Sequence, residues 1–200
     1  MAHIIFLVLA YGLGGLPFGL WVAKRVRGID IREHGSRNTG ATNVFRVVGK
    51  KWGFLVLFLD ALKGYLAVCV PGWLLGAEAV AGWRLAFGVT AILGHSFSLF
   101  LKFKGGKGVA TSLGVFLGLA WLPTLLTFAL WSAVFAVSHI ISVASLSAAL
   151  FFPVLVLLTY RGQADFSGMM TVSVLLTVFI FYTHRANIQR LRRGEEKRLF

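Results

Sequence analysis

The sequence predicts an all-α, polytopic integral membrane protein, and two observations carry that prediction. Of the 200 residues, 58% are hydrophobic and only 14% are charged, which is more apolar than ordinary soluble domains. The 53 residues from Gly108 to Tyr160 contain no Lys, Arg, Asp or Glu, although one helical crossing needs only about 20 residues. Several helices therefore cross there. No composition break divides the chain, so we expect a single domain over residues 1–200.

The distribution of basic residues predicts the orientation. Seventeen of the 20 Lys and Arg residues lie in three segments, residues 24–51, 102–107 and 185–198, and such clusters beside apolar spans face the cytoplasm. The first basic cluster follows the uncharged stretch 4–22 rather than preceding it, which indicates an uncleaved first span with the amino end outside. The net charge of +13 comes without a nucleic-acid-binding motif, so no nucleic acid is expected as a partner.

The apolar stretches predict seven transmembrane helices, with the carboxyl end in the cytoplasm. The charge-free stretch begins inside and ends outside, so it crosses an odd number of times, and its length fits three crossings. Pro123 marks one break because proline has no amide hydrogen to donate, and the small polar run 138–147 marks the other. The expected spans are 3–23, 52–72, 80–101, 109–122, 124–140, 144–160 and 166–183.

The first polar segment is "GSRNTGATNVFR", residues 35–46. Glycines allow positive φ and close approach of the backbone, and short polar side chains offer hydrogen bonds. Such a segment suits a phosphate cradle, with Arg46 able to bind an anion through two parallel hydrogen bonds. The alternative is a helix cap and turn between two spans. The candidate phosphate ligands are Gly35, Ser36, Asn38, Gly40, Ala41, Thr42 and Asn43.

The second segment is "KFKGGKG", residues 102–108, directly before an apolar helix. Glycines leave main-chain N–H groups unshielded at a helix N-terminus, where the helix dipole also favours an anion. The spacing is not that of a Walker P-loop, because Leu101 and Gly108 stand where Gly and Ser or Thr are needed. The alternative is an ordinary basic cytoplasmic loop. The candidate phosphate ligands here are Lys104, Gly105, Gly106, Lys107 and Gly108.

Three polar residues within the expected spans are candidates for a supporting role. Asp60 and Lys63 are three residues apart, share a helix face, and can pair where an unpaired charge is expensive. A structural ion pair and a role in the site are equally compatible with this spacing. His95, near the cytoplasmic end of the third span, is more typical of a hydrogen-bonded interior residue than of a catalyst.

The third basic segment is "HRANIQRLRRGEEKR", residues 184–198. One interpretation is a juxtamembrane helix that binds anionic lipid. That interpretation does not require His184 and Asn187, which are three residues apart on one helix face, so both are candidate site residues. Glu196 is expected to pair with a nearby basic side chain, and Arg190 to support the site.

Taken together, four segments resemble the signature segments of the bacterial acyl-phosphate:glycerol-3-phosphate acyltransferases, the PlsY family: "GSRNTGATNVFR", "LDALKG", "GHSFSLFLKFKGGKGVAT" and "HRANIQRLRRGEE". The resemblance implies seven helices in the bacterial inner membrane and an active site that faces the cytoplasm. It implies transfer of a fatty acyl group from acyl phosphate to the sn-1 hydroxyl of glycerol 3-phosphate, giving lysophosphatidic acid and inorganic phosphate. It further implies that a soluble phosphate acyltransferase of the PlsX family makes the donor and contacts this protein transiently.

Other glycerol phosphate acyltransferases use a His-x4-Asp pair, and none of the five histidines here has Asp at that spacing. Arg37 departs from the PlsY pattern, where glycine is usual, and Arg198 stands where lysine is common. The first difference leaves the pose of its loop open. No carboxylate cluster suggests a metal, and no cofactor is expected.

An acyl phosphate is already activated, so the site needs only to align two anions and stabilise charge. We expect the donor phosphate to contact Ser36, Asn38, Gly40 and the amides of Gly105 and Gly106. The predicted catalytic residues are Ser36, Arg46, Lys104, His184 and Asn187, of which Arg46, Lys104 and Asn187 hold glycerol phosphate.

The base is the donor phosphate itself, His184, or a relay through Ser36, and the first is favoured because no histidine has a carboxylate partner visible in the sequence. A covalent acyl-Ser36 is a lesser alternative. Competing functions are a membrane carrier for an organophosphate, which predicts polar residues throughout the spans, and a lipid-binding scaffold, which leaves the glycine loops unexplained.

Overall fold

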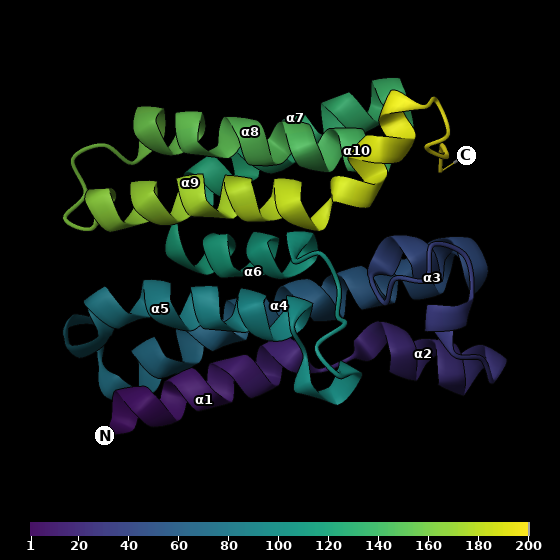
Figure 1. Ribbon diagram of the computed structural model, residues 1–200. Coiled ribbons are helices and arrows are strands. Elements are labelled where there is room, and N and C mark those ends of the chain that lie inside the picture. Colours follow the sequence, from purple (N-terminus) through teal and green to yellow (C-terminus); the bar gives the residue numbers. More distant parts are fainter. Residues whose placement is uncertain (200) are drawn as a thin grey trace. The chain divides into compact units, whose positions relative to one another are not determined.

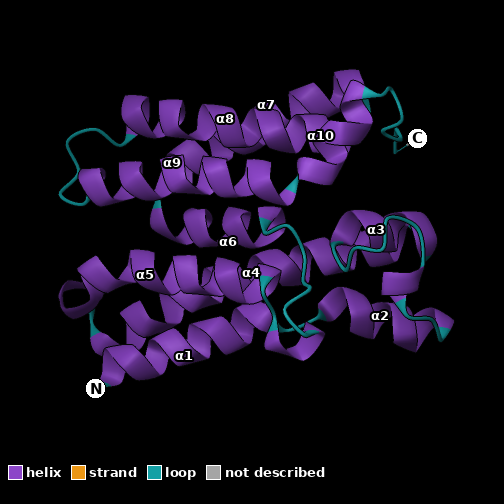
Figure 2. Cartoon of the chain, viewed as in Figure 1, coloured by secondary structure: helices purple, strands orange, loops and turns teal. Residues whose placement is uncertain are grey.

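The computed structural model describes residues 1–199, except for the side chains of residues 77–82, and every regular element among them is a helix (Figures 1 and 2). Two compact units divide the chain between Leu119 and Ala120. The first unit contains α1 (Ala2–Gly15), α2 (Phe18–Arg27), η1 (Ile31–Glu33), α3 (Ala41–Val47), α4 (Lys50–Leu75), α5 (Ala77–Ser96), η2 (Leu99–Leu101) and α6 (Val109–Leu119). The second contains α7 (Trp121–Ser138), α8 (Ile141–Thr159), α9 (Phe166–Thr183) and α10 (Arg185–Arg192).

Among residues 1–199, six helical segments are long and apolar enough to cross a membrane: Ala2–Arg27, Lys50–Leu75, Trp83–Leu101, Trp121–Ser138, Ile141–Thr159 and Phe166–Thr183. They coincide with six of the seven expected spans. The remaining one corresponds to α6, which has 11 residues and is about 17 Å long at 1.5 Å per residue. The hydrocarbon core is about 30 Å thick, so the count of seven crossings and the orientation stay predictions.

The first span is interrupted, contrary to the prediction of one helix over residues 3–23. α1 ends at Gly15, and Leu16 takes an extended conformation with φ −55° and ψ 122°. Pro17 explains the break, because it has no N–H to donate and forces the preceding residue out of the helical region. α2 then starts at Phe18 and carries the chain into the first basic segment.

Both breaks predicted in the charge-free stretch occur close to their expected places. The first lies between Leu119 and Trp121, so that Pro123 falls in the first turn of α7, a position where its missing N–H costs nothing. The second consists of His139 and Ile140, and His139 ends α7 in the left-handed conformation with φ 57°.

Close backbone contacts hold the helices of the first unit together. A Cβ at Gly14 of α1 would lie 2.1 Å from the carbonyl oxygen of Ala91 in α5. A Cβ at Gly114 of α6 would lie 1.7 Å from the carbonyl oxygen of Ala61 in α4. Small residues at such crossings let membrane helices approach closely.

A buried apolar cluster forms around α2, at the end of the first unit that carries α3 and the connection from α5 to α6 (Figure 1). Leu101 of η2 is buried in the same cluster as Ile31 and Val44. The segment that leads into residues 102–108 therefore packs against residues on both sides of the loop of residues 34–43. The cluster consists of Leu20, Ala23, Ile31, Val44, Val48, Val56 and Leu101.

In the second unit, α8 packs against both α7 and α9. The Nε1–H of Trp131 in α7 donates to Ser145 Oγ in α8 at 3.2 Å. The tail after α10 folds back within the unit, since the Leu199 N–H donates to the His139 carbonyl at 2.8 Å. The turn between α7 and α8 is thus covered by the end of the described chain.

Candidate functional site

The loop before α3 is built around one buried amide side chain, that of Asn43, which is 1% exposed. Its Oδ1 accepts the Ser36 N–H at 2.9 Å. Its Nδ2 donates to the carbonyl oxygens of Ile31, His34 and Asn38, at 3.2, 3.0 and 2.8 Å. Asn43 therefore organises the loop, and its polar atoms already have partners, which corrects its assignment as a phosphate ligand.

Two positions in this loop take the left-handed conformation. Gly35 has φ +60°, and a Cβ there would lie 2.3 Å from Asn43 Oδ1. Arg37 has φ +58°, which costs an L-residue roughly 1–2 kcal/mol and is the conformation that the glycine usual in the family would adopt freely. Gly40 is different, because its φ is −76° and its N–H donates to Asn38 Oδ1 at 2.8 Å.

Several groups of this loop remain accessible. The side chains of Ser36 and Arg46 are exposed. Among residues 1–199, the Ser36 Oγ and the amides of Ala41 and Thr42 make no hydrogen bond. Ala41 and Thr42 form the first turn of α3, where amides lack intrahelical acceptors. Two amides, a hydroxyl and a guanidinium thus lie on one short loop and helix.

Residues 102–108 are arranged in the opposite way. The Gly105 N–H donates to the Ser96 carbonyl at 3.0 Å, and the Gly106 N–H donates to the His95 carbonyl at 3.1 Å. The prediction that both amides are free to bind phosphate is therefore wrong, because the end of α5 already accepts from them. A Cβ at Gly105 would lie 2.0 Å from the His95 carbonyl oxygen, and one at Gly106 would lie 2.1 Å from His95 Nε2. Close packing explains both glycines.

Three residues of the same loop have a strained or left-handed backbone, and the Lys104 side chain between them is exposed. Lys102, Phe103 and Gly108 have φ values of 52°, 61° and 87°, and only for glycine is that region free of steric cost. The N–H of Lys104 donates to the Leu101 carbonyl at 3.1 Å, while its side chain is exposed. Lys107 is partly buried.

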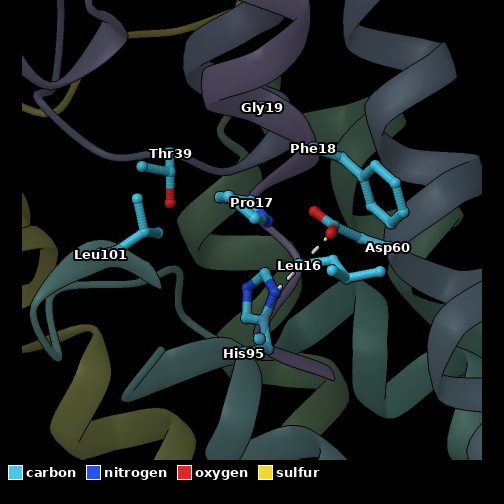
Figure 3. Close-up of a pocket in the computed structure, with 9 residues that line it drawn as sticks. Leu16, Pro17, Phe18, Gly19, Thr39, Asp60, His95 and Leu101 are labelled. Carbon is cyan, nitrogen blue, oxygen red and sulfur yellow. Dashed lines mark ion pairs between the residues drawn. The ribbon is translucent and has the colours of Figure 1, made fainter. Parts of the chain in front are cut away.

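Asp60 and Lys63 of α4 lie next to His95 of α5. Lys63 Nζ lies 2.6 Å from Asp60 Oδ1, and both side chains are at most 4% exposed, so the expected ion pair is present. The His95 Nδ1 lies 3.7 Å from the same oxygen, which is longer than a hydrogen bond. Figure 3 shows the His95 ring and the Asp60 carboxylate facing one another beside Leu16 and Pro17, in a pocket also lined by Thr39 and Leu101.

In the second unit, His184 is 3% exposed and lies between α9 and α10. Its Nδ1 is 2.9 Å from the Ile180 carbonyl oxygen. Because a carbonyl oxygen can only accept, Nδ1 carries the proton, and Nε2 of the neutral ring keeps a lone pair. The residue therefore has the tautomer that a base acting through Nε2 requires.

Glu196 organises the other polar residues of this unit. Its carboxylate accepts from Ser142 Oγ at 2.9 Å, Asn187 Nδ2 at 2.5 Å and Arg190 Nε at 2.6 Å. Burial alone raises the pKa of Glu196, but these hydrogen bonds outweigh burial and hold its pKa below the ordinary value. The Arg190 contact is the expected pairing with a basic side chain.

The predicted catalytic residues divide between the units, with Ser36, Arg46 and Lys104 in the first, and His184 and Asn187 in the second. Their convergence stays a prediction. Two residues that the sequence did not single out hold the surrounding backbone or side chains. Ser98 Oγ donates to the Gly15 carbonyl at 2.6 Å, and Ser142 donates to Glu196. Hydroxyls in apolar runs are common, so neither carried a signal of its own.

Comparison with known proteins gives a consistent result over the whole chain. The profile of the glycerol-3-phosphate acyltransferase family matches residues 4–194. Glycerol-3-phosphate acyltransferase of Fusobacterium nucleatum is 41% identical over 198 residues, which cover 99% of this chain and 98% of that protein. The corresponding protein of Enterococcus faecalis is 44% identical over 209 residues, covering 100% of this chain and 93% of that protein.

Two solved structures have the same fold. One is a crystal structure of PlsY, an integral membrane glycerol 3-phosphate acyltransferase, in its glycerol 3-phosphate form. It matches with a TM-score of 0.88 and 36% identity, covering 99% of this chain and 96% of that one. The lysophosphatidic acid form matches with a TM-score of 0.86 and 35% identity, covering 99% and 95%. With its apolar helices, this chain is a multi-pass integral membrane protein, and it belongs to the glycerol-3-phosphate acyltransferase family.

Proposed function

We propose that this protein transfers a fatty acyl group from acyl phosphate to the sn-1 hydroxyl of glycerol 3-phosphate, releasing lysophosphatidic acid and inorganic phosphate. The observation that carries the proposal is the full-length likeness to a protein whose solved forms contain the acceptor and the product. The choice of acyl phosphate as donor rests on the four sequence segments that resemble the PlsY family.

The accessible groups of the first unit suit a phosphorylated donor. The amides of Ala41 and Thr42 at the start of α3, together with the exposed Ser36 hydroxyl, are donors for phosphate oxygens. In this assignment the α3 amides take the place of the Gly105 and Gly106 amides, which already bond to α5. Arg46 and Lys104, both exposed, supply the positive charge that a second phosphate, that of glycerol 3-phosphate, requires.

The reaction needs no covalent intermediate. The sn-1 oxygen attacks the carbonyl carbon of the acyl phosphate, the bond between that carbon and the phosphate oxygen breaks, and the hydroxyl proton leaves on the departing phosphate. An acyl-Ser36 would require a base to activate the hydroxyl, and the Ser36 Oγ has no hydrogen-bonded base among residues 1–199. The donor phosphate is therefore our preferred base.

His184 is the alternative base, because the Ile180 contact selects the neutral tautomer in which Nε2 carries no proton. A pH–rate profile of His184→Ala separates the two. Near-total loss of turnover together with disappearance of the acidic limb would assign the base to His184. A lowered rate that keeps the acidic limb supports the donor phosphate.

The test of the function is acyl transfer by the purified protein in detergent. Glycerol 3-phosphate is supplied with a long-chain acyl phosphate or with the matching acyl-CoA, and lysophosphatidic acid and inorganic phosphate are followed together. We expect equal amounts of both products from acyl phosphate and no transfer from acyl-CoA. Uptake of glycerol 3-phosphate into proteoliposomes without conversion would indicate a carrier instead.

We further propose that the protein lies in the bacterial inner membrane with the three basic segments in the cytoplasm, among anionic lipids. A soluble acyltransferase of the PlsX family would then deliver the donor from the same side. Labelling of single cysteines placed at residues 37 and 161 with a membrane-impermeant reagent tests this orientation, since the two positions should react from opposite sides.

A further inference from the structure

The break between α1 and α2 is held by two side chains, that of Lys63 in α4 and that of Ser98 in the short connection between α5 and η2. The Ser98 Oγ donates to the Gly15 carbonyl at 2.6 Å, and Lys63 Nζ donates to the Leu16 carbonyl at 3.0 Å. Lys63 Nζ also lies 5.5 Å from the centre of the Phe18 ring, within cation–π distance. Lys63 therefore contacts the chain on both sides of Pro17.

The start of α2, directly after the break, packs against the loop of residues 35–43. Gly19, in the first turn of α2, lies so close to the buried Thr39 that a Cβ there would be 1.8 Å from the Thr39 carbonyl oxygen. Thr39 is the residue before Gly40, which caps α3. A shift of the break would consequently move Thr39 and, through it, the amides of Ala41 and Thr42.

The same network reaches the second loop from the other side. Lys63 pairs with Asp60 at 2.6 Å, and the His95 Nδ1 faces that carboxylate at 3.7 Å (Figure 3). The opposite edge of the His95 ring packs on Gly106, where a Cβ would be 2.1 Å from Nε2. The His95 carbonyl accepts the Gly106 N–H at 3.1 Å. Lys104 lies two residues before Gly106.

We propose that Asp60, Lys63 and His95 are positioning residues that hold the loop of residues 35–43 and the loop of residues 102–108 in a fixed relation to one another. None of the three is assigned a contact with substrate. This inference rests on the proposed function only in that the two loops carry Ser36, Arg46 and Lys104. Each link in the path from Thr39 to Gly106 is a contact described above.

The competing explanation is that Asp60 and Lys63 form a purely structural ion pair. The stability and activity of single and double variants distinguish this explanation from a positioning role. Two buried charges cost desolvation energy, and a well-packed apolar pair usually stabilises a fold at least as well. Removing one partner leaves an unpaired buried charge and destabilises strongly, whereas removing both together should restore stability. A structural pair therefore predicts that the double variant recovers stability and activity together.

The experiment compares Asp60→Asn, Lys63→Met and the double variant Asp60→Leu/Lys63→Met, assayed well below the melting temperature of each. We expect both single variants to melt at lower temperature and the double variant to recover. In the double variant kcat/KM should nevertheless fall about 10- to 100-fold for both donor and acceptor, the loss expected when reacting groups are misplaced by about 1 Å. Full activity of the double variant would overturn the proposal.

Two further variants keep the test decisive. His95→Gln removes the ring that packs on Gly106 while keeping both partners of the Asp60–Lys63 ion pair, and should also lower kcat/KM. If the double variant does not fold, unchanged kcat/KM in His95→Gln overturns the proposal. Arg84→Met is the matched control, because Arg84 donates to the Gly118 carbonyl at 2.6 Å away from both loops. It should lower the melting temperature and leave kcat/KM unchanged.

The wild-type protein, assayed in the same series, separates this inference from the proposed function. Product from acyl-CoA alone refutes the proposed donor, and the variants are then compared with that donor. Product from neither donor refutes the proposed function and the positioning role together. Product from acyl phosphate with a fully active double variant refutes the positioning role alone.

Discussion

The two glycine-containing loops of the first unit are both predicted from the sequence to bind phosphate, yet they are built in opposite ways. Residues 35–43 are organised from within by the Asn43 side chain, and the Ala41 and Thr42 amides have no acceptor among residues 1–199. Residues 102–108 are held from outside, since the end of α5 accepts the amides of Gly105 and Gly106. In the first loop the backbone is available to a ligand, whereas in the second it is used to place Lys104.

The comparison shows that glycine content does not reveal which backbone amides of a loop lack a hydrogen-bond acceptor. A glycine in a loop can expose an N–H to an anion or allow two backbones to approach closely, and the presence of the glycine alone does not distinguish the two cases. Four substitutions test this difference between the loops.

The largest effect is expected from Ser36→Ala. The Ser36 side chain is exposed, and its Oγ makes no hydrogen bond among residues 1–199, so its loss should leave the melting temperature unchanged. Loss of a hydrogen-bond donor to developing charge should lower kcat about 100- to 1,000-fold. Steady-state kinetics and thermal unfolding check both parts, and a large fall in melting temperature would show that Ser36 is structural.

Gly105→Ala should follow. The added methyl group would lie 2.0 Å from the His95 carbonyl oxygen, which cannot move aside as a flexible side chain could. The loop must therefore shift, and we expect kcat/KM to fall about 100-fold together with the melting temperature. Gly12→Ala in α1 is the control, because a Cβ there meets nothing within 4 Å. Similar behaviour of the two variants would contradict the packing explanation.

Asn43→Ala should destabilise the first loop. It leaves the carbonyls of Ile31, His34 and Asn38 without this donor, which we expect to lower the free energy of unfolding by about 3 kcal/mol. Denaturant unfolding of the detergent-solubilised protein measures the change. Activity that survives undiminished would show that the loop does not need this organiser.

The smallest effect is expected from Arg37→Gly. Arg37 has φ +58°, so glycine relieves the steric cost of the left-handed conformation but adds flexibility to the unfolded chain. The two terms partly cancel, and we expect a change in stability within about 1 kcal/mol. Denaturant unfolding measures this change, and kcat/KM should stay close to that of the wild-type protein. A large fall in kcat/KM without a matching fall in stability would indicate that the guanidinium of Arg37 contacts a substrate.

The parts of the fold that depend on composition could be predicted from the sequence. Apolar runs and basic clusters located six spans, and the three-residue spacing of Asp60 and Lys63 predicted their ion pair. The sequence analysis does not predict the interruption at Pro17, because the uncharged stretch around it is long enough to form one continuous span. The sequence does not show that Asn43 organises its loop, because its hydrogen bonds reach as far as Ile31, 12 residues away. Contacts between distant segments have no signature in local sequence, which is also why Ser98 went unnoticed.

The most direct test of the difference between the loops is residue-resolved amide hydrogen exchange, with and without a non-hydrolysable acyl phosphonate in place of the donor. We predict that Gly105 and Gly106 exchange slowly in both conditions, because α5 already accepts their hydrogens. Ala41 and Thr42 should exchange quickly in the free protein and slow markedly when the phosphonate binds. Protection that appears on binding at Gly105 and Gly106, with Ala41 and Thr42 unchanged, would contradict this account.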